Sequence, residues 1–219
     1  MVLSRVLTQK RCGMNYISAG RSWQMRDSVI PGIPTAELMK DLQSKSPETY
    51  DHCVRVALLS ERVALRLNLN SEMSMKLMRG CFLHDIGKLF LPVSMLIHSG
   101  PLTESKWRIM KLHPVVGAHI LETDKGICEN ALDIVRYHHE RWDGQGYPYG
   151  RAEEDIPFLA RICSIIDAFD CMIAGRPYQS SKGIQEAKEE LLRHAGTQFD
   201  GNLVNVFVNL IDDGDHLFR

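Results

Sequence analysis

Histidines and aspartates stand in this sequence at positions where a helical pattern calls for apolar core residues. His52 precedes Val56 and Val63 by four and eleven residues, and therefore shares the apolar face of their helix. Burying several titratable groups in a helical bundle costs free energy unless they pair with one another or bind a metal. The chain must therefore fold so that these polar side chains find partners.

Histidines and aspartates occupy expected core positions at several places along the chain. The residues concerned are His52, His84, Asp85, His113, His138, His139, Asp167 and Asp170. Imidazole and carboxylate are ligands of iron, manganese, zinc and nickel, and helix bundles build metal sites from facing side chains. The residues therefore indicate a buried metal centre. No cysteine stands in the set, which argues against a thiolate-rich zinc site.

Helical periodicity dominates from Thr35 onward, and no alternating apolar runs separate the helices, so we predict an all-α fold. Ser46 and Pro47 predict the start of a helix that runs to about residue 67. Further helices are predicted over 71–84, 104–112, 114–122, 130–139, from 157 onward, over 182–194 and over 200–211. The segment 140–156 is the one long loop, and loops of that length are often functional.

Residues 1–33 differ from the rest of the chain, because five basic residues precede the first acidic residue, Asp27. We interpret residues 1–33 as a basic extension, either a solvated arm or a small hairpin between Val6 and Trp23. Residues 34–219 form the predicted main domain.

Charge and hydropathy argue against several classes of protein. The 26 Lys and Arg residues against 27 Asp and Glu give a formal net charge of −1, so no global positive field is available to hold a DNA duplex. The longest uncharged stretch, residues 89–103, is shorter than the roughly 18 residues of a membrane-spanning helix. We expect no membrane span and no secretory signal. The six scattered cysteines are typical of a reducing cytoplasm.

Several ordered motifs resemble the HD superfamily of metal-dependent phosphohydrolases. Its His…His-Asp…Asp signature is matched by His52, by His84 with Asp85, and by Asp167. The stretch HHERWDGQGYP, from His138 to Pro148, is similar to the HHExxDGxGYP motif of the HD-GYP branch. The resemblance extends from about residue 35 to residue 210. It implies an HD-type helical bundle with a long Gly-Tyr-Pro loop.

Proteins of the HD-GYP branch are bacterial phosphodiesterases that cleave cyclic di-GMP. The resemblance implies the same activity here, in the cytoplasm, with linear pGpG as product and further cleavage to GMP left open. One alternative is hydrolysis of another cyclic dinucleotide, such as cyclic GMP-AMP. The other is a module that binds cyclic di-GMP or docks partner proteins with little turnover.

The resemblance also implies ligands for two divalent metals, with iron or manganese favoured. One metal would be held by His52, His84, Asp85 and Asp167, and the other by His113, His138 and His139, with Asp85 bridging. Glu48 stands one helical turn before His52, at the spacing of a third metal ligand. Acidic residues are favoured in the first turn of a helix, and this preference explains Glu48 equally well.

The expected chemistry follows from the metals. Two metals about 3.5–4 Å apart clamp a phosphodiester and lower the pKa of a bridging water. Asp85 and Lys88 are assigned to catalysis. Substrate contacts are assigned to Lys88, Asp170, Arg176 and Tyr178. Arg176 offers a bidentate contact to phosphate or guanine.

The long loop is expected to shape the rim of the site through Asp143, Gly146, Tyr147 and Pro148. Asp143 would brace the loop or a ligand histidine. The resemblance associates this loop with signalling-protein partners, and the sequence leaves a homodimer open.

Overall fold

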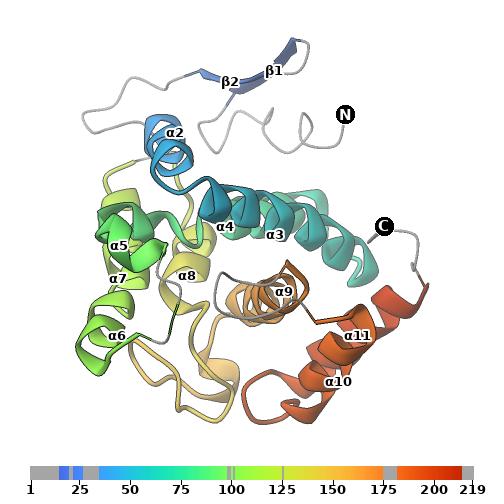
Figure 1. Cartoon of the computed structure of the whole chain (residues 1–219). Helices are drawn as coiled ribbons and strands as arrows, with labels where there is room; N and C mark the ends of the chain where they lie inside the picture. Colours follow the sequence, from blue (N-terminus) through green and yellow to red (C-terminus); the bar gives the residue numbers. More distant parts are fainter. Residues whose placement is uncertain are drawn as a thin grey trace.

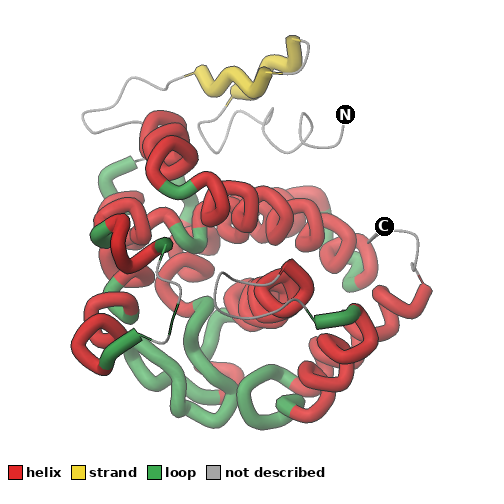
Figure 2. The backbone as a smooth tube through the Cα atoms, in the orientation of Figure 1, coloured by secondary structure: helices red, strands yellow, loops and turns green. Residues whose placement is uncertain are grey.

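The computed structural model describes residues 35–97, 100, 102–124, 126–174 and 182–213, together with the backbone of two short strands. The strands β1 (Asn15–Ala19) and β2 (Ser22–Arg26) pair antiparallel. All other regular elements of the described residues are helices (Figures 1 and 2). The predicted all-α fold of the main domain is therefore confirmed.

The longer helices follow one another in the order that the periodicity predicts, and three short helices (η1, α5 and η2) were not predicted. The first are α2 (Thr35–Lys45), α3 (Pro47–Arg66), α4 (Ser71–Leu83) and the short η1 (Ile86–Phe90). They are followed by α5 (Val93–Leu96), α6 (Glu104–Met110), α7 (His113–Leu121) and α8 (Glu129–Tyr137). The last are η2 (Glu153–Asp155), α9 (Phe158–Ala174), α10 (Ile184–Arg193) and α11 (Gly201–Asp213). The predicted long loop separates α8 from α9 and contains η2.

The start of α3 differs in detail from the expectation. Ser46 occupies the N-cap position and Pro47 follows it, but the Ser46 hydroxyl makes no capping bond to the backbone. It lies 2.8 Å from the Thr49 hydroxyl instead. In α4, by contrast, Asn70 Oδ1 accepts a hydrogen bond from the Met73 N–H at 2.9 Å. Side-chain capping therefore supports α4, whereas α3 begins at its proline.

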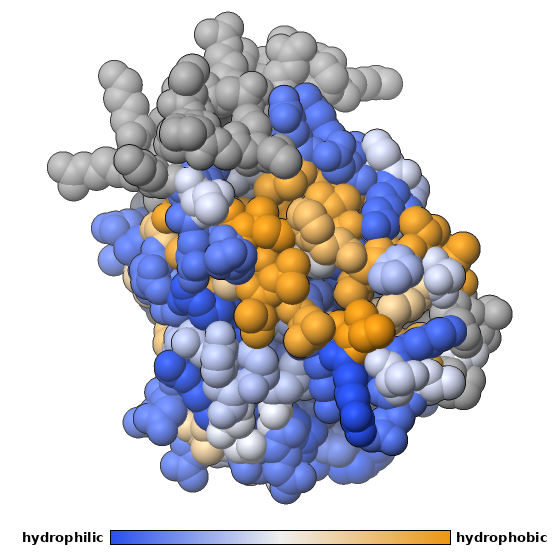
Figure 3. Space-filling model, turned by 90° about the vertical axis from the view of Figure 1, so that its left-hand side faces the viewer, coloured by the Kyte–Doolittle hydropathy of each residue, from blue (hydrophilic) through white to orange (hydrophobic). Residues whose placement is uncertain are grey.

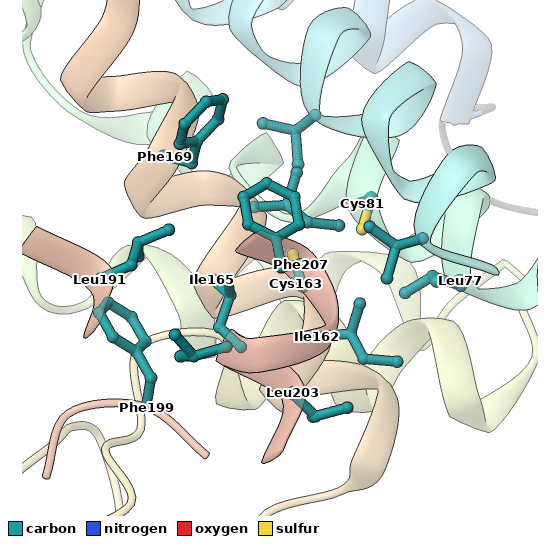
Figure 4. Close-up of a cluster of buried hydrophobic side chains, with 14 of the residues drawn as sticks. Leu77, Cys81, Ile162, Cys163, Ile165, Phe169, Leu191, Phe199, Leu203 and Phe207 are labelled. Atoms are coloured by element: carbon teal, nitrogen blue, oxygen red, sulfur yellow. The ribbon is translucent and has the colours of Figure 1, made fainter. Parts of the chain in front are cut away.

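The α9 helix lies in the centre of the fold, with α3 on one side and α10 and α11 on the other (Figure 1). Its apolar side chains, among them Ile162, Ile165 and Phe169, form the main core with residues of α3, α4, α10 and α11 (Figure 4). The rings of Phe169 and Phe207 meet edge to face, with centroids 5.1 Å apart. Because α9 is enclosed in this way, any polar residue on it must be satisfied inside the protein.

A second core lies between α2, η1, α7 and α8 and includes Leu42, Leu83, Ile86 and Leu121. There η1 and α7 approach closely enough that a Cβ at Gly87 would lie 2.0 Å from the His113 carbonyl oxygen. Glycine is therefore required at this contact. The contact brings the segment after Asp85 against the start of α7.

The face on the left of Figure 1 carries a continuous apolar area (Figure 3). Exposed apolar residues on the elements of that side include Phe90, Val93, Ile97 and Leu112. Among the helices that the structure describes, none combines the length and the apolar composition that crossing a membrane requires.

We expect Gly87→Ala to lower the free energy of unfolding by about 1–3 kcal/mol, because the added methyl overlaps the backbone of α7. Gly183→Ala is the matched control. A Cβ there meets nothing within 4 Å, so a change within about 0.5 kcal/mol is expected. Denaturant unfolding of both variants measures the difference. Equal stabilities would show that the close approach of η1 and α7 is not required.

Candidate metal centre

Seven of the predicted ligands converge at one place between the helices. His52 lies on α3 and Asp167 on α9, and His113 opens α7. His84 and His138 stand at the C-caps of α4 and α8, and each is followed directly by a further member of the cluster, Asp85 and His139. The set is buried or nearly buried, with Asp85 only 1% exposed. Helix ends thus bring together residues that lie far apart in the sequence.

The first group of potential ligand atoms is formed by His52, His84, Asp85 and Asp167. His52 Nε2 lies 3.0 Å from Asp167 Oδ1 and 3.2 Å from His84 Nε2. His84 Nε2 lies 3.4 Å from Asp85 Oδ2. This is the set expected to hold one metal.

The second group consists of Asp85, His113, His138 and His139, whose potential ligand atoms all lie within 4.8 Å of one another. His113 Nε2 lies 3.2 Å from Asp85 Oδ1 and 3.2 Å from His138 Nε2. Asp85 therefore presents Oδ2 to the first group and Oδ1 to the second. This arrangement suits a carboxylate that bridges two cations.

Backbone carbonyls fix the orientation of three of the imidazoles. His84 Nδ1 lies 2.7 Å from the Cys81 carbonyl oxygen, and His113 Nδ1 lies 2.8 Å from that of Met110. His138 Nδ1 is bonded in the same way to the carbonyl of Val135, at 3.0 Å. When Nδ1 of a neutral ring donates its proton to the carbonyl, Nε2 is unprotonated and points into the cluster. This is the tautomer that binds metal.

The donor set fits a divalent cation. Two unprotonated Nε2 atoms, such as those of His113 and His138 at 3.2 Å, cannot hydrogen-bond to each other. Asp85 Oδ1 is buried and has no hydrogen-bond partner. Buried polar atoms are seldom left unsatisfied, and a cation satisfies imidazole nitrogens and carboxylate oxygens together.

The Asp170 carboxylate contacts a histidine of the cluster and an arginine of α3. It is buried, and its Oδ2 accepts a hydrogen bond from His52 Nδ1 at 2.7 Å. Arg55 holds the same carboxylate through both oxygens, at 2.8 and 2.9 Å. The Asp170 carboxylate thus orients a potential ligand, and the expected contact of Asp170 with substrate stays a prediction. Arg55, which the sequence analysis did not single out, is part of this arrangement.

Electrostatics keep the two carboxylates of the cluster ionised. Burial raises the pKa of Asp85, but the charges of Lys88 and His84 outweigh burial and hold that pKa well below its ordinary value. Burial likewise raises the pKa of Asp167, and the hydrogen bond from His52 reverses the shift. Both groups are therefore charged at neutral pH, as metal binding requires.

The histidines divide into two classes. Burial lowers the pKa of His138 to about 3, and it lowers the pKa of His113 and His139 as well. Burial also opposes charge on His84, but the neighbouring Asp85 carboxylate raises its pKa well above the ordinary value. Bonds to Asp167 and Asp170 raise the pKa of His52 in the same way. The charged form is therefore disfavoured on the histidines of the second group and favoured on His52 and His84.

The remaining predicted residues are placed as follows. Lys88 Nζ lies 2.5 Å from Asp85 Oδ2. Glu48 is exposed on the first turn of α3 and belongs to neither group of potential ligands in the described part of the chain. Arg176 and Tyr178 lie outside the described residues.

A cavity of about 640 Å³ opens onto the cluster. Its walls include His138, His139 and Asp167, together with Trp107, Lys111 and Tyr147. The Lys111 ammonium lies 5.3 Å from the centroid of the Tyr147 ring. The cavity therefore combines aromatic surface and positive charge beside the potential metal ligands.

The long loop forms one wall of this cavity. Tyr147 stacks on His139 with ring centroids 4.7 Å apart. Gly146 passes so close to Glu140 and Arg141 that no Cβ fits there. Asp143 bonds to Arg141 and to the Gln145 N–H and thus braces the loop itself. The Glu140 carboxylate accepts the backbone N–H groups of residues 149 and 151, a bracing role that the sequence analysis did not assign.

Cys171 was also missed. Its Sγ lies within 4.8 Å of potential ligand atoms of both His52 and Asp167. Cys171 follows Asp167 by four residues on α9, and residues at this spacing share a helix face. That spacing was the signal in the sequence.

Asp170→Asn should weaken divalent-metal affinity by about 10- to 100-fold, because His52 loses a charged orienting partner. Arg55→Gln should have a smaller effect in the same direction. Arg66→Gln, which removes an exposed ion pair near the other end of α3, is the control and should leave affinity unchanged. Calorimetric titration with Mn²⁺ measures all three. Equal affinity of D170N and wild-type protein would contradict the orienting role.

Metal binding should release protons, because the pKa values of His52 and His84 are raised in the metal-free protein and a ligand imidazole must be neutral. Apparent affinity should therefore rise with pH above 7, until the raised pKa values of these histidines are passed. Titration calorimetry in buffers of different ionisation enthalpy counts the protons. Binding that releases none at pH 7 would refute this assignment of charge.

The comparisons with known proteins agree with this geometry. Residues 37–203 match the HD domain family. The chain is 35% identical over 173 residues to a cyclic di-GMP phosphodiesterase of Thermotoga maritima, covering 78% of this chain and 47% of the relative. It is also 35% identical over 177 residues to 3'3'-cGAMP-specific phosphodiesterase 2 of Vibrio cholerae, covering 80% of this chain and 34% of the relative. The chain thus spans less than half the length of these relatives.

A solved structure shares the fold. Bd1817, an HDG"Y"P protein of Bdellovibrio bacteriovorus, superposes with a TM-score of 0.63 at 23% identity, over 81% of this chain and 60% of that one. The HD-type helical bundle expected from the sequence is therefore confirmed. The match to the family covers most of the described domain and includes every residue of the two ligand groups. The chain belongs to the HD domain family, as the resemblance to its HD-GYP branch implied.

Proposed function

We propose that this chain is a metal-dependent phosphodiesterase that hydrolyses cyclic di-GMP to linear pGpG. The observation that carries the proposal is the placement of Asp85, whose two oxygens face two separate groups of potential metal ligands. A shared carboxylate between two cation sites is what hydrolysis of a phosphodiester by two metals requires. A module that only binds a nucleotide has no need of such a centre.

The relatives support the reaction class. The relative from Thermotoga maritima is a cyclic di-GMP phosphodiesterase, and the relative from Vibrio cholerae is specific for 3'3'-cGAMP. Because the two are equally similar to this chain, hydrolysis of cyclic GMP-AMP is the second candidate function. Both substrates are cyclic dinucleotides with two anionic phosphodiesters, so both need cations in the site.

The side chains of the cluster would hold two divalent cations, and we favour iron or manganese because the resemblance to the HD-GYP branch implies them; imidazoles and carboxylates suit both metals. When bound, these cations would supply Lewis acidity and lower the pKa of nearby water. His52 would be held in place by Asp170, and His113 by the carbonyl of Met110. Lys88, now paired with Asp85, is the cation nearest to that carboxylate and would turn to the substrate phosphate.

The cavity suits a dinucleotide. Its volume, about 640 Å³, is in the range of roughly 300–1,000 Å³ that is usual for ligand pockets. Trp107 and Tyr147 offer aromatic surface for a base, and Lys111 offers a charge for the second phosphate. Arg176 and Tyr178 remain predicted substrate contacts, and Glu48 remains a predicted ligand of a third metal. A cytoplasmic location, partner docking on the loop and a homodimer also remain predictions.

Asp85→Ala should abolish hydrolysis and remove most bound metal, because both ligand groups lose their common member. Asp41→Ala, which changes an exposed carboxylate of α2, is the control and should preserve both. Turnover of cyclic di-GMP and of cyclic GMP-AMP is measured with Mn²⁺ and with Fe²⁺, beside metal content by mass spectrometry. If wild-type protein binds two metals but cleaves neither dinucleotide, the proposed function is wrong. If D85A keeps its metal and rate, the proposed site is wrong.

A further inference from the structure

Cys171 occupies the boundary between the polar cluster and the cavity. It lies on α9, one turn beyond Asp167, and its side chain is half-buried in the cavity wall. Its Sγ, a nitrogen of His52 and an oxygen of Asp167 all lie within 4.8 Å of one another. Three ligand types, from imidazole, carboxylate and thiol, therefore meet at this point.

We propose that the Cys171 sulfur is a further ligand of the cation held on the His52 side of the cluster. The inference rests on the proposed metal centre and changes its chemistry, because it makes one of the two subsites a mixed nitrogen, oxygen and sulfur site. The other subsite, formed by Asp85, His113, His138 and His139, has no sulfur among its potential ligands. The two subsites would then differ in the metals that they favour.

The hydrogen bonding of the thiol points to this role. The Cys171 S–H donates to Asp167 Oδ1 at 3.3 Å, and the same oxygen lies 3.0 Å from His52 Nε2. A cation bound by His52 and Asp167 would occupy the lone pairs of Asp167 Oδ1. The thiol would then lose the acceptor of its hydrogen bond. On ligation the thiol proton leaves to solvent through the adjoining cavity, and the sulfur electron pair forms the bond to the cation.

One acceptor atom of the cluster is left for a cation. Asp85 Oδ1 is buried without a hydrogen-bond partner, although Lys88 pairs with the other oxygen. Among the other cysteines of the described chain, Cys53 interacts with the His84 ring, but its sulfur belongs to none of the groups of potential metal ligands. Cys53, Cys81 and Cys163 are buried in the apolar cores, and Cys128 stands at the N-terminus of α8. None of these four belongs to a group of potential metal ligands.

A thiolate ligand has consequences for metal choice. Soft sulfur favours Fe²⁺, Co²⁺ and Zn²⁺ over Mn²⁺ relative to a site made of nitrogen and oxygen alone. The His52 subsite should therefore discriminate against manganese more strongly than the His113 subsite does. Cys171→Ser should reduce this discrimination, because a hydroxyl is a hard and weak ligand.

Cobalt spectroscopy tests the proposal directly. Wild-type protein titrated with Co²⁺ in the absence of oxygen should develop a near-ultraviolet sulfur-to-cobalt charge-transfer band. C171A and C171S should bind Co²⁺ through the remaining histidines and carboxylates without that band. C128A, which removes a half-buried cysteine at the N-cap of α8, the end opposite His138, should keep it. The proposal is overturned if the band persists in C171A, or if wild-type protein binds cobalt without developing it.

A second measurement uses the wild-type protein alone. Alkylation of Cys171 by iodoacetamide, followed by peptide mass spectrometry, should slow when Zn²⁺ is added, because the reacting electron pair is engaged by the metal. An unchanged rate at saturating Zn²⁺ contradicts the proposal. If wild-type protein binds neither Co²⁺ nor Zn²⁺, the metal centre itself fails. Metal binding without a sulfur signature overturns the role of Cys171 alone.

Discussion

The buried carboxylate of Asp85 is the group on which the site depends. One oxygen faces His52 and His84, the other faces His113 and His138, and the latter oxygen has no hydrogen-bond partner. An ionised carboxylate in so buried a position is costly unless cations neutralise it. The Lys88 ammonium supplies one positive charge, at Oδ2 of Asp85. We therefore propose two cations, one on each side of Asp85.

The scaffold positions the ligands through the ends of helices. The last carbonyls of a helix have no partner within the helix, and they are available to side chains. Carbonyls near the ends of α4, α6 and α8 accept the Nδ1–H of His84, His113 and His138. One set of interactions thus satisfies the helix ends and points Nε2 into the cluster. The ligands that lie within helices, His52 and Asp167, are placed instead by the packing of α3 against α9.

Much of this was predictable from the sequence, because helical periodicity showed both the helices and the polar residues that break their apolar faces. The order of the main helices follows from that pattern, and the seven potential ligands that converge are those that the resemblance to the HD superfamily implied. The hydrogen-bonded environment of each ligand does not, since it depends on contacts between residues far apart in the chain. For this reason the bonds of the Asp170 carboxylate to His52 and Arg55 were not predicted. Cys171 was overlooked because its neighbours in space include His52, on another helix.

The central claim is that two cations bind on opposite sides of Asp85. Anomalous diffraction from crystals grown with Mn²⁺, recorded at the manganese absorption edge, tests it most directly. The account predicts two peaks, one among His52, His84 and Asp167 and one among His113, His138 and His139, with Asp85 contacting both. A single peak, or peaks away from Asp85, would contradict it.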